Sequence, residues 1–203
     1  MTSAALSTLL AGLLFGLSLI VAIGAQNTFV LQQGLLRRHV TAVVAICAAS
    51  DVALIGAGVA GASVALDGRE WLLTTVRIAG AAFLLTYAAL AVRRLGRPAQ
   101  LPAGGHRPTS AGSVIAVCLA FTWLNPAVYL DTVVLLGSVA NSRGPGEWWF
   151  GLGAALGSIA WFVGLGFGAR LLTPLFARRA AWRALDGFVA VVMTITAGRI
   201  LLG

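Results

Sequence analysis

The feature that most constrains this chain is a series of apolar stretches, each long enough to cross a lipid bilayer. A transmembrane helix needs about 20 consecutive and mostly apolar residues, and several stretches of the chain meet that requirement. They cover residues 4–36, 40–66, 71–92, 110–140, 148–169 and 184–202. These stretches are too long for barrel strands and do not alternate in polarity. The sequence therefore predicts an all-α integral membrane protein with six transmembrane helices.

The charge of the chain agrees with this prediction. Of its 203 residues, 59% are hydrophobic and 10% are charged, whereas a soluble domain carries about 25% charged residues. The net charge of +8 comes from arginine alone, because the chain has no lysine. The arginines gather in short segments between the apolar stretches rather than on a basic face with aromatic residues. We therefore expect a lipid bilayer and no nucleic acid as partner.

The same arginines predict an orientation. Ten of them lie in the loops after the first, third and fifth stretches, against two in the loops after the second and fourth. Because positive loops stay in the cytoplasm, both termini are predicted to be extracytoplasmic. The longest loop is rich in proline and glycine. Residues 96–109 are therefore predicted to be a cytoplasmic linker between two halves, residues 1–95 and 110–203.

Two of the apolar stretches are too long for one straight span. The first covers about 33 residues, which would form a helix about 50 Å long, whereas the bilayer core is about 30 Å thick. Its candidate break is the polar interruption Gly24, Gln26 and Asn27. In the fourth stretch the candidate is Asn125 with Pro126, because proline lacks a backbone donor and clashes with the preceding turn.

The two candidate breaks also occupy matching places in a weak internal repeat. Residues 26–30 align with residues 124–128, and further along Ser50 and Ser158 take equivalent places. A repeat of three helices is inverted in its second copy, because three is odd. Inverted repeats with interrupted helices are typical of secondary transporters. We therefore predict two inverted three-helix repeats in which helices 1 and 4 are interrupted.

Ionisable residues inside the apolar stretches are the first candidates for function. A carboxylate at the bilayer centre costs about 2.5–3.5 kcal/mol, so Asp51 and Asp131 are predicted to bind a cation or a proton, with Tyr129 as a polar neighbour. The structural alternatives are an ion pair between Asp51 and Arg77, and a solvated Asp131 near the outer interface. Arg77 itself either balances a charge, binds an anion or snorkels to the interface.

The breaks are the second candidates. Asn27 and Asn125 could cap half-helices, whose partly positive N-termini suit a substrate carboxylate. Gln26 adds a donor and an acceptor, although a plain kink with locally satisfied groups remains the alternative. These groups together predict a receptor for a zwitterion. The predicted substrate-binding residues are Gln26, Asn27, Asp51, Asn125, Pro126, Tyr129 and Asp131.

Enzymatic chemistry is not predicted. No nucleophile–base pair or hydrolytic dyad is recognisable, and Cys47 and Cys118 form no CxxC motif or metal-ligand spacing. We therefore expect neither a catalytic residue, nor a metal site, nor a cofactor.

The same residues resemble a known family. The matching motifs are residues 24–27, the segment from Cys47 to Asp51, and the Trp-Leu-Asn-Pro string at 123–126 with the following Tyr129. They are similar to the LysE/ArgO family of basic amino acid exporters. The resemblance implies export of L-lysine, L-arginine or close analogues across a bacterial inner membrane, by alternating access coupled to protons or to the membrane potential. It is also compatible with a homodimer.

One departure from the family and two alternatives stay open at this point. The family usually has proline where this chain has Ala25, which weakens the expectation of unwinding at the first break. The residues alone also allow an exporter of another small solute, such as a neutral amino acid or a metal cation. A channel-like membrane protein without transport activity is the other alternative.

Overall fold

The chain is helical throughout the part that the computed structural model describes, which is residues 3–21, 24–61, 70–95, 110–174, 176 and 179–202. The predicted linker 96–109 and the end of the second apolar stretch lie outside these residues. The elements are α1 (Ser3–Ile20), α2 (Ala25–Leu36), α3 (Val40–Val59), α5 (Glu70–Leu95), α6 (Ala111–Trp123), α7 (Pro126–Tyr129), the π-helix η1 (Leu130–Leu136), α8 (Gly137–Asn141), the short 3₁₀ helices η2 (Gly144–Gly146) and η3 (Ala169–Leu172), α9 (Glu147–Gly168) and α10 (Arg179–Leu202).

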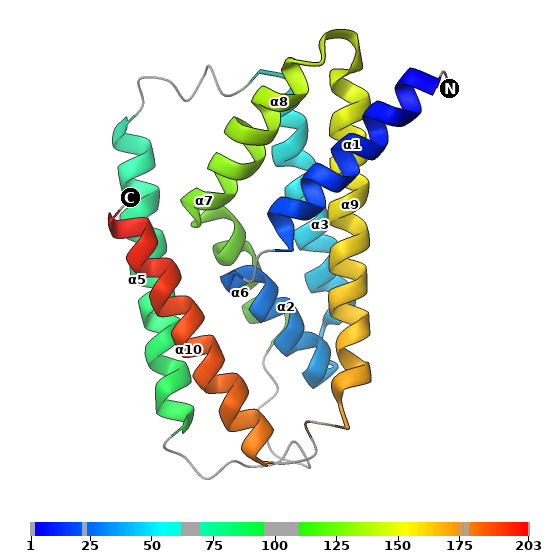
Figure 1. Cartoon of the computed structure of the whole chain (residues 1–203). Helices are drawn as coiled ribbons and strands as arrows, with labels where there is room; N and C mark the ends of the chain where they lie inside the picture. The colour runs from blue at the N-terminus through cyan, green and yellow to red at the C-terminus, as the bar shows by residue number, and fades with distance from the viewer. Residues whose placement is uncertain are drawn as a thin grey trace.

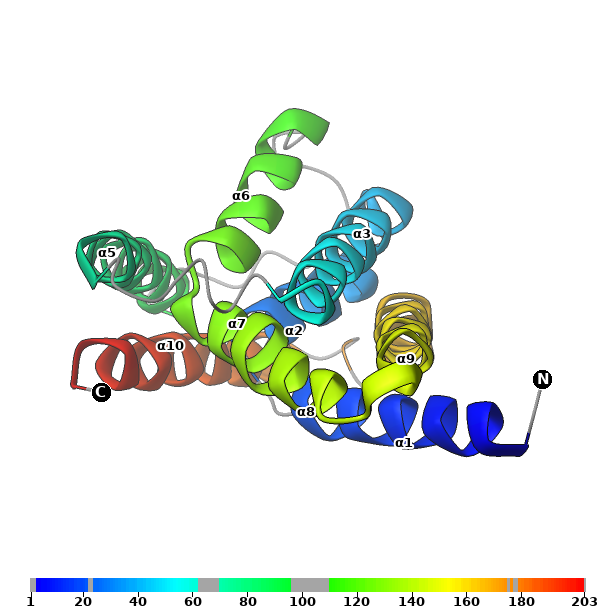
Figure 2. The same ribbon diagram turned by 90° about the horizontal axis from the view of Figure 1, so that it is seen from above.

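The long helices form two groups, and the half-helices α2 and α7 lie between them (Figure 1 and Figure 2). On one side α3 and α9 run next to each other in opposite directions, and α1 packs along α9 (Figure 1). On the other side α5 and α10 form a second antiparallel pair (Figure 1).

Length and hydropathy identify a multi-pass membrane protein. Within the described residues, four helical segments are apolar and long enough to cross a membrane: Ser3–Ile20, Val40–Val59, Gly144–Leu172 and Ala180–Leu202. A fifth candidate is the bent pair that α6 forms with residues 126–141. The remaining predicted span, residues 71–92, lies within α5, which is helical over 26 residues and is not among these candidates.

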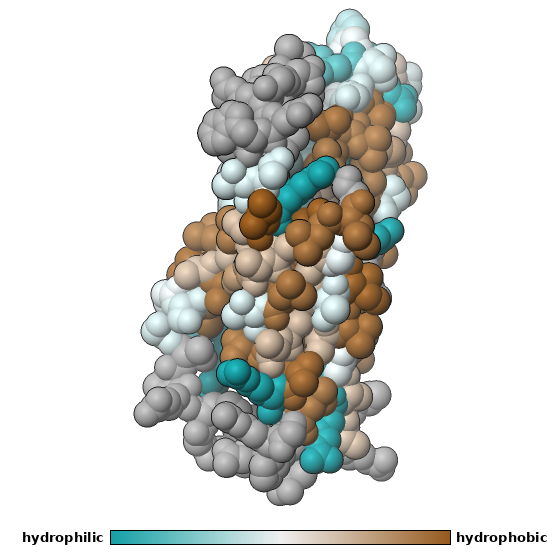
Figure 3. Space-filling model, turned by 90° about the vertical axis from the view of Figure 1, so that its left-hand side faces the viewer, coloured by the Kyte–Doolittle hydropathy of each residue, from teal (hydrophilic) through white to brown (hydrophobic). Residues whose placement is uncertain are grey.

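The outer surface fits a lipid environment. Side chains that point away from the bundle on α5 and α10 are apolar and exposed, among them Ile78, Leu90, Val191 and Ile195. The side of the molecule that carries α5 and α10 is mostly apolar, with hydrophilic atoms above and below (Figure 3). Such a surface is unfavourable in water and favourable against acyl chains.

Both over-long stretches are interrupted, although the first break begins earlier than predicted. Helix α1 ends at Ile20, and α2 begins after Gly24, whose backbone is extended. Gln26 and Asn27 therefore lie in the first turn of α2 and not in unwound chain. The second break falls at Leu124 and Asn125, as predicted, and bends the helix by 58°. We call the interruption between Ile20 and Ala25 the first break and residues 124–125 the second break.

Glycines bring the first group of helices into backbone contact. A Cβ atom on Gly153 would overlap the carbonyl oxygen of Leu9 and lie 2.8 Å from the nitrogen of Leu13. A Cβ on Gly16 would lie 2.9 Å from the Cα of Ala154. The small residues thus allow α1 and α9 to approach closely, which is how helices associate where no hydrophobic effect drives them together.

This contact predicts different effects for two glycine substitutions on α9. Gly153→Ala should lower the apparent melting temperature in detergent, because overpacking a tight contact costs about 1–3 kcal/mol. Gly164→Ala is the matched control, since a Cβ there meets nothing within 4 Å and alanine favours a helix. The measurement is thermal unfolding of both purified variants. Equal melting temperatures for the two variants would contradict the packing.

Candidate functional site

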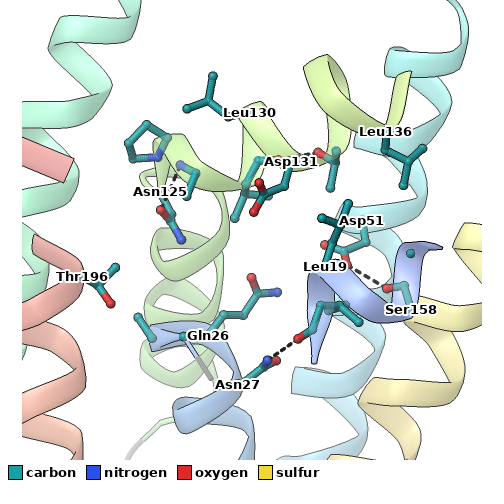
Figure 4. A pocket seen from close by; sticks show the side chains of 18 of the residues that line it. Leu19, Gln26, Asn27, Asp51, Asn125, Leu130, Asp131, Leu136, Ser158 and Thr196 are labelled. Carbon is teal, nitrogen blue, oxygen red and sulfur yellow. Dashed lines mark hydrogen bonds between the residues drawn. The ribbon is translucent and has the colours of Figure 1, made fainter. Parts of the chain in front are cut away.

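The two breaks meet at a cavity of about 520 Å³. Its walls come from both halves of the chain: the end of α1, the start of α2, α3, the second break, η1, α9, and the two outer helices α5 and α10. The side chains that line it point toward a common centre (Figure 4). Of the predicted site residues, the cavity brings together Gly24, Gln26, Asn27, Asp51, Arg77, Asn125, Pro126 and Asp131, and it leaves Tyr129 out.

Two carboxyl groups face this cavity from neighbouring elements. Asp51 on α3 is 5% exposed, and its Oδ2 accepts a hydrogen bond of 2.8 Å from the Ser158 hydroxyl on α9. Asp131 belongs to η1 and is half-buried. π-Helical turns are rare and occur frequently at functional sites. Because α3, η1 and α9 position them, the two acids lie on the same side of the cavity (Figure 4).

The predicted alternative for Asp51, an ion pair with Arg77, is not formed. Both side chains lie in the described part of the chain and both line the cavity, yet the hydrogen-bond partner of Asp51 is Ser158. A neutral hydroxyl satisfies one carboxylate oxygen without neutralising its charge. The hydroxyl occupies only one oxygen of the carboxyl group, which leaves the other oxygen for a further partner.

Gln26 brings a buried donor without a partner to the cavity wall. Its Nε2 is buried and makes no hydrogen bond, and the amide projects into the cavity (Figure 4). An unsatisfied buried donor costs about 1–3 kcal/mol. A ligand acceptor in the cavity would remove that cost.

Asn27 does not cap the second half-helix, so this expectation was wrong. The cap position of α2 is Gly24, and no side chain bonds there. The Asn27 Nδ2 instead donates to the Ile20 carbonyl oxygen, at 2.6 Å, and its Oδ1 accepts from the Trp161 indole N–H, at 3.2 Å. Asn27 thus joins the end of α1, the start of α2 and α9. An asparagine in the first turn can bond either the free amides of its own helix or the end of the preceding helix, and sequence spacing does not distinguish the two.

Asn125 does cap a helix. Its Oδ1 accepts from the Ala127 backbone N–H at 3.2 Å, and its backbone is extended. Pro126 occupies the first helical position, where its missing N–H removes no intrahelical bond, and proline drives the preceding residue out of the helical region. The second break therefore follows directly from the Asn-Pro dipeptide.

Tyr129 supports the second break from outside the cavity. Its hydroxyl donates to the carbonyl oxygen of Trp123 at 2.8 Å. The Trp123 indole N–H in turn donates to the Ser50 hydroxyl on α3, at 3.2 Å. Tyr129 and Asn27 thus play the same part at the two breaks. Each donates a hydrogen bond to the last carbonyl oxygen of the preceding half-helix, which has no partner within that helix.

Four further polar residues that line the cavity were not among the predicted site residues: Thr132, Ser158, Thr196 and Arg199. Ser158 was recognised only as the repeat equivalent of Ser50, and that equivalence was the available signal for it. Arg199 lies near the chain end, where snorkelling is the ordinary expectation. Thr196 lies three residues before Arg199, on the face of α10 that borders the cavity.

Comparison with known proteins identifies the family. The family model described as LysE type translocator matches residues 17–203. The chain belongs to the LysE family. No solved structure matches it.

Relatives of this LysE-family chain are transporters and exporters, not enzymes. A Mycobacterium tuberculosis protein named as a candidate amino-acid transporter is 48% identical over 87% of this chain and 88% of its own length. The lysine exporter LysE of Corynebacterium diphtheriae is 34% identical over 97% of this chain and 100% of its own length. The arginine exporter ArgO of Enterobacter sp. strain 638 is 39% identical over 90% of this chain and 87% of its own length. These names support amino acid export and confirm the predicted resemblance.

The two neighbouring amides of the site should behave differently on substitution. Asn27→Ala should lower the apparent melting temperature even without substrate, since it leaves the Ile20 carbonyl and the Trp161 indole unpaired, at about 1–3 kcal/mol. Gln26→Ala should leave the melting temperature unchanged or higher, because its Nε2 has no partner to lose. Thermal unfolding of the detergent-purified variants measures both. A lower melting temperature for Gln26→Ala than for Asn27→Ala would contradict these roles.

Proposed function

We propose that this protein is a secondary transporter that exports L-arginine, L-lysine or close analogues across the bacterial inner membrane. The observation that carries the proposal is the meeting of Asp51, Asp131 and the unpartnered Gln26 amide in one cavity. The exporters among the relatives act on these two amino acids. A cavity of this size also suits a solute of amino acid dimensions.

The acidic side of the cavity would bind the cationic groups of the substrate. The Oδ2 of Asp51 accepts a hydrogen bond from Ser158, and within the described residues its Oδ1 accepts none. Asp131 makes no hydrogen bond in the same part of the chain. A basic amino acid carries two cations, one on the α-amino group and one on the side chain, so two carboxylates match its charge. Charge-assisted hydrogen bonds of this kind are about twice as strong as neutral ones.

The first turn of α2 would receive the substrate carboxylate. Gln26 offers its unpaired Nε2 there, and no side chain caps the N-terminus of this 12-residue helix. The first backbone N–H groups of a helix have no intrahelical partner and carry partial positive charge. An incoming carboxylate would satisfy these donors and the glutamine amide together.

The arrangement of helices supports alternating access by two inverted three-helix repeats, residues 1–95 and 110–203. Each half would contribute one interrupted helix, one long helix beside the cavity and one outer helix. The long helices α3 and α9 are antiparallel neighbours, and so are the outer helices α5 and α10 (Figure 1). Rocking of one half against the other would expose the cavity to each side in turn. The arginine-rich loops would face the cytoplasm, with both termini outside, and protons or the membrane potential would drive export.

Counterflow in proteoliposomes tests the proposal. Vesicles loaded with unlabelled arginine or lysine should accumulate the labelled amino acid in a saturable way, and excess leucine should compete weakly. Leucine exchange as fast as arginine exchange would indicate a neutral amino acid carrier instead. Flux that neither saturates nor distinguishes stereoisomers would indicate a channel.

Removal of the Asp51 charge should reduce transport without disrupting the fold. Asp51→Asn keeps the shape and a partner for Ser158 but loses the charge that would hold the substrate cation. We expect arginine counterflow to fall about tenfold or more, the equivalent of one charge-assisted bond. Glu147→Gln, at the start of α9 and outside the cavity lining, is the control and should retain wild-type exchange. Wild-type exchange by Asp51→Asn would refute the assignment.

A further inference from the structure

Two arginines line the same cavity as the two acids, and they come from the outer helices. Arg77 lies on α5 and Arg199 on α10. These helices stand on one side of the cavity, and Asp51 with Ser158 stands on the other (Figure 4). The lining therefore holds two positive and two negative side chains, separated across the space between the groups of helices.

Arg77 faces inward as part of the packed side of α5. The buried residues Gly80, Ala81, Leu84 and Ala88 follow it at helical spacing, and residues three or four apart share one helix face. A Cβ on Gly80 would overlap the Leu124 carbonyl oxygen, so α5 touches the second break one turn from Arg77. Arg77 is thereby held near the cavity by close packing.

The geometry of α10 places Arg199 beside the same space. Thr196, Arg199 and Ile200 all line the cavity, which is the spacing of one helical face. Arg199 remains more exposed than Arg77. It therefore forms the rim of the cavity, whereas Arg77 belongs to its wall.

The two guanidinium groups are not consumed by structural ion pairs. Among the residues that the structure describes, neither arginine forms an ion pair with Asp51 or Asp131 or makes a hydrogen bond. A guanidinium presents five N–H donors in a fork that matches a carboxylate. Two guanidinium groups in the cavity lining are therefore available to an anion that enters the cavity.

We propose that Arg77 and Arg199 form a subsite for the substrate α-carboxylate, opposite the aspartates that bind its cations. This inference rests on the proposed transport of basic amino acids and extends it. The arginines complete the donor set of Gln26 and the start of α2, and they balance the charge of the two acids. The substrate carboxylate thereby becomes a required element of recognition. An amine that lacks a carboxylate is rejected, because it leaves the positive charges of Arg77 and Arg199 without a counter-charge.

Agmatine, which is arginine without its carboxylate, tests the subsite. Labelled arginine counterflow is inhibited with unlabelled arginine or agmatine, in vesicles clamped at zero membrane potential because the two compounds differ in charge. The readout is the ratio of the two inhibitory concentrations, which does not depend on the amount of folded protein. The variants are Arg77→Gln, Arg77→Lys and Arg199→Gln, with Arg93→Gln on the exposed end of α5 as the matched control.

In the wild type, agmatine should inhibit at least about tenfold more weakly than arginine, the worth of one charge-assisted pair. Arg77→Gln and Arg199→Gln should each reduce this ratio about tenfold, through weaker arginine binding and unchanged or stronger agmatine binding. Arg77→Lys should keep part of the ratio, and Arg93→Gln all of it. An unchanged ratio in both glutamine variants would overturn the subsite while leaving transport intact. Absence of arginine counterflow in the wild type would instead overturn the proposed function.

Discussion

A helix that is interrupted inside a membrane exposes backbone groups that lipid cannot satisfy, and the structure depends on how two such interruptions are stabilised. Every carbonyl and N–H group in the hydrocarbon region needs a partner from the protein. The first break is closed by Asn27, which bonds the carbonyl of Ile20. The second is closed by Tyr129, which bonds the carbonyl of Trp123. These bonds tie the ends of α1 and α6 to the half-helices that follow them, and the cavity lies where the two breaks meet.

Each break is also tied to the long helix beside it by an indole. Trp161 of α9 donates to Asn27, and Trp123 donates to Ser50 of α3. Glycine contacts hold the same long helices against their neighbours: a Cβ on Gly58 of α3 would lie 2.7 Å from the carbonyl oxygen of Thr132 in η1. The polar bonds and the close packing therefore act on the same elements. They fix the position of Asp51 and Asp131 relative to the breaks.

Much of this framework could be predicted from the sequence, because length and polarity determine it. A run about 33 residues long cannot stay straight within a bilayer core of about 30 Å, and Pro126 determines where the fourth stretch bends. The roles of Asn27 and Tyr129 could not be predicted in the same way. An amide in the first turn of a helix can bond forward or backward, and the choice depends on where α1 ends in space. The contributions of Ser158 and Arg199 likewise depend on which helices come together, and no local pattern encodes that.

The acceptors that close both breaks are main-chain atoms, and this has a consequence for the variation that the protein can tolerate. A carbonyl oxygen is present whatever residue occupies the position, so the bond itself places no requirement on the side chain of Ile20. The whole requirement falls on the donor, because few side chains other than asparagine combine its length with an N–H group and a second acceptor for Trp161. The two ends of this bond therefore tolerate substitution unequally. The bond places no requirement on the side chain at position 20, whereas the side chain at position 27 must supply both the donor and the acceptor.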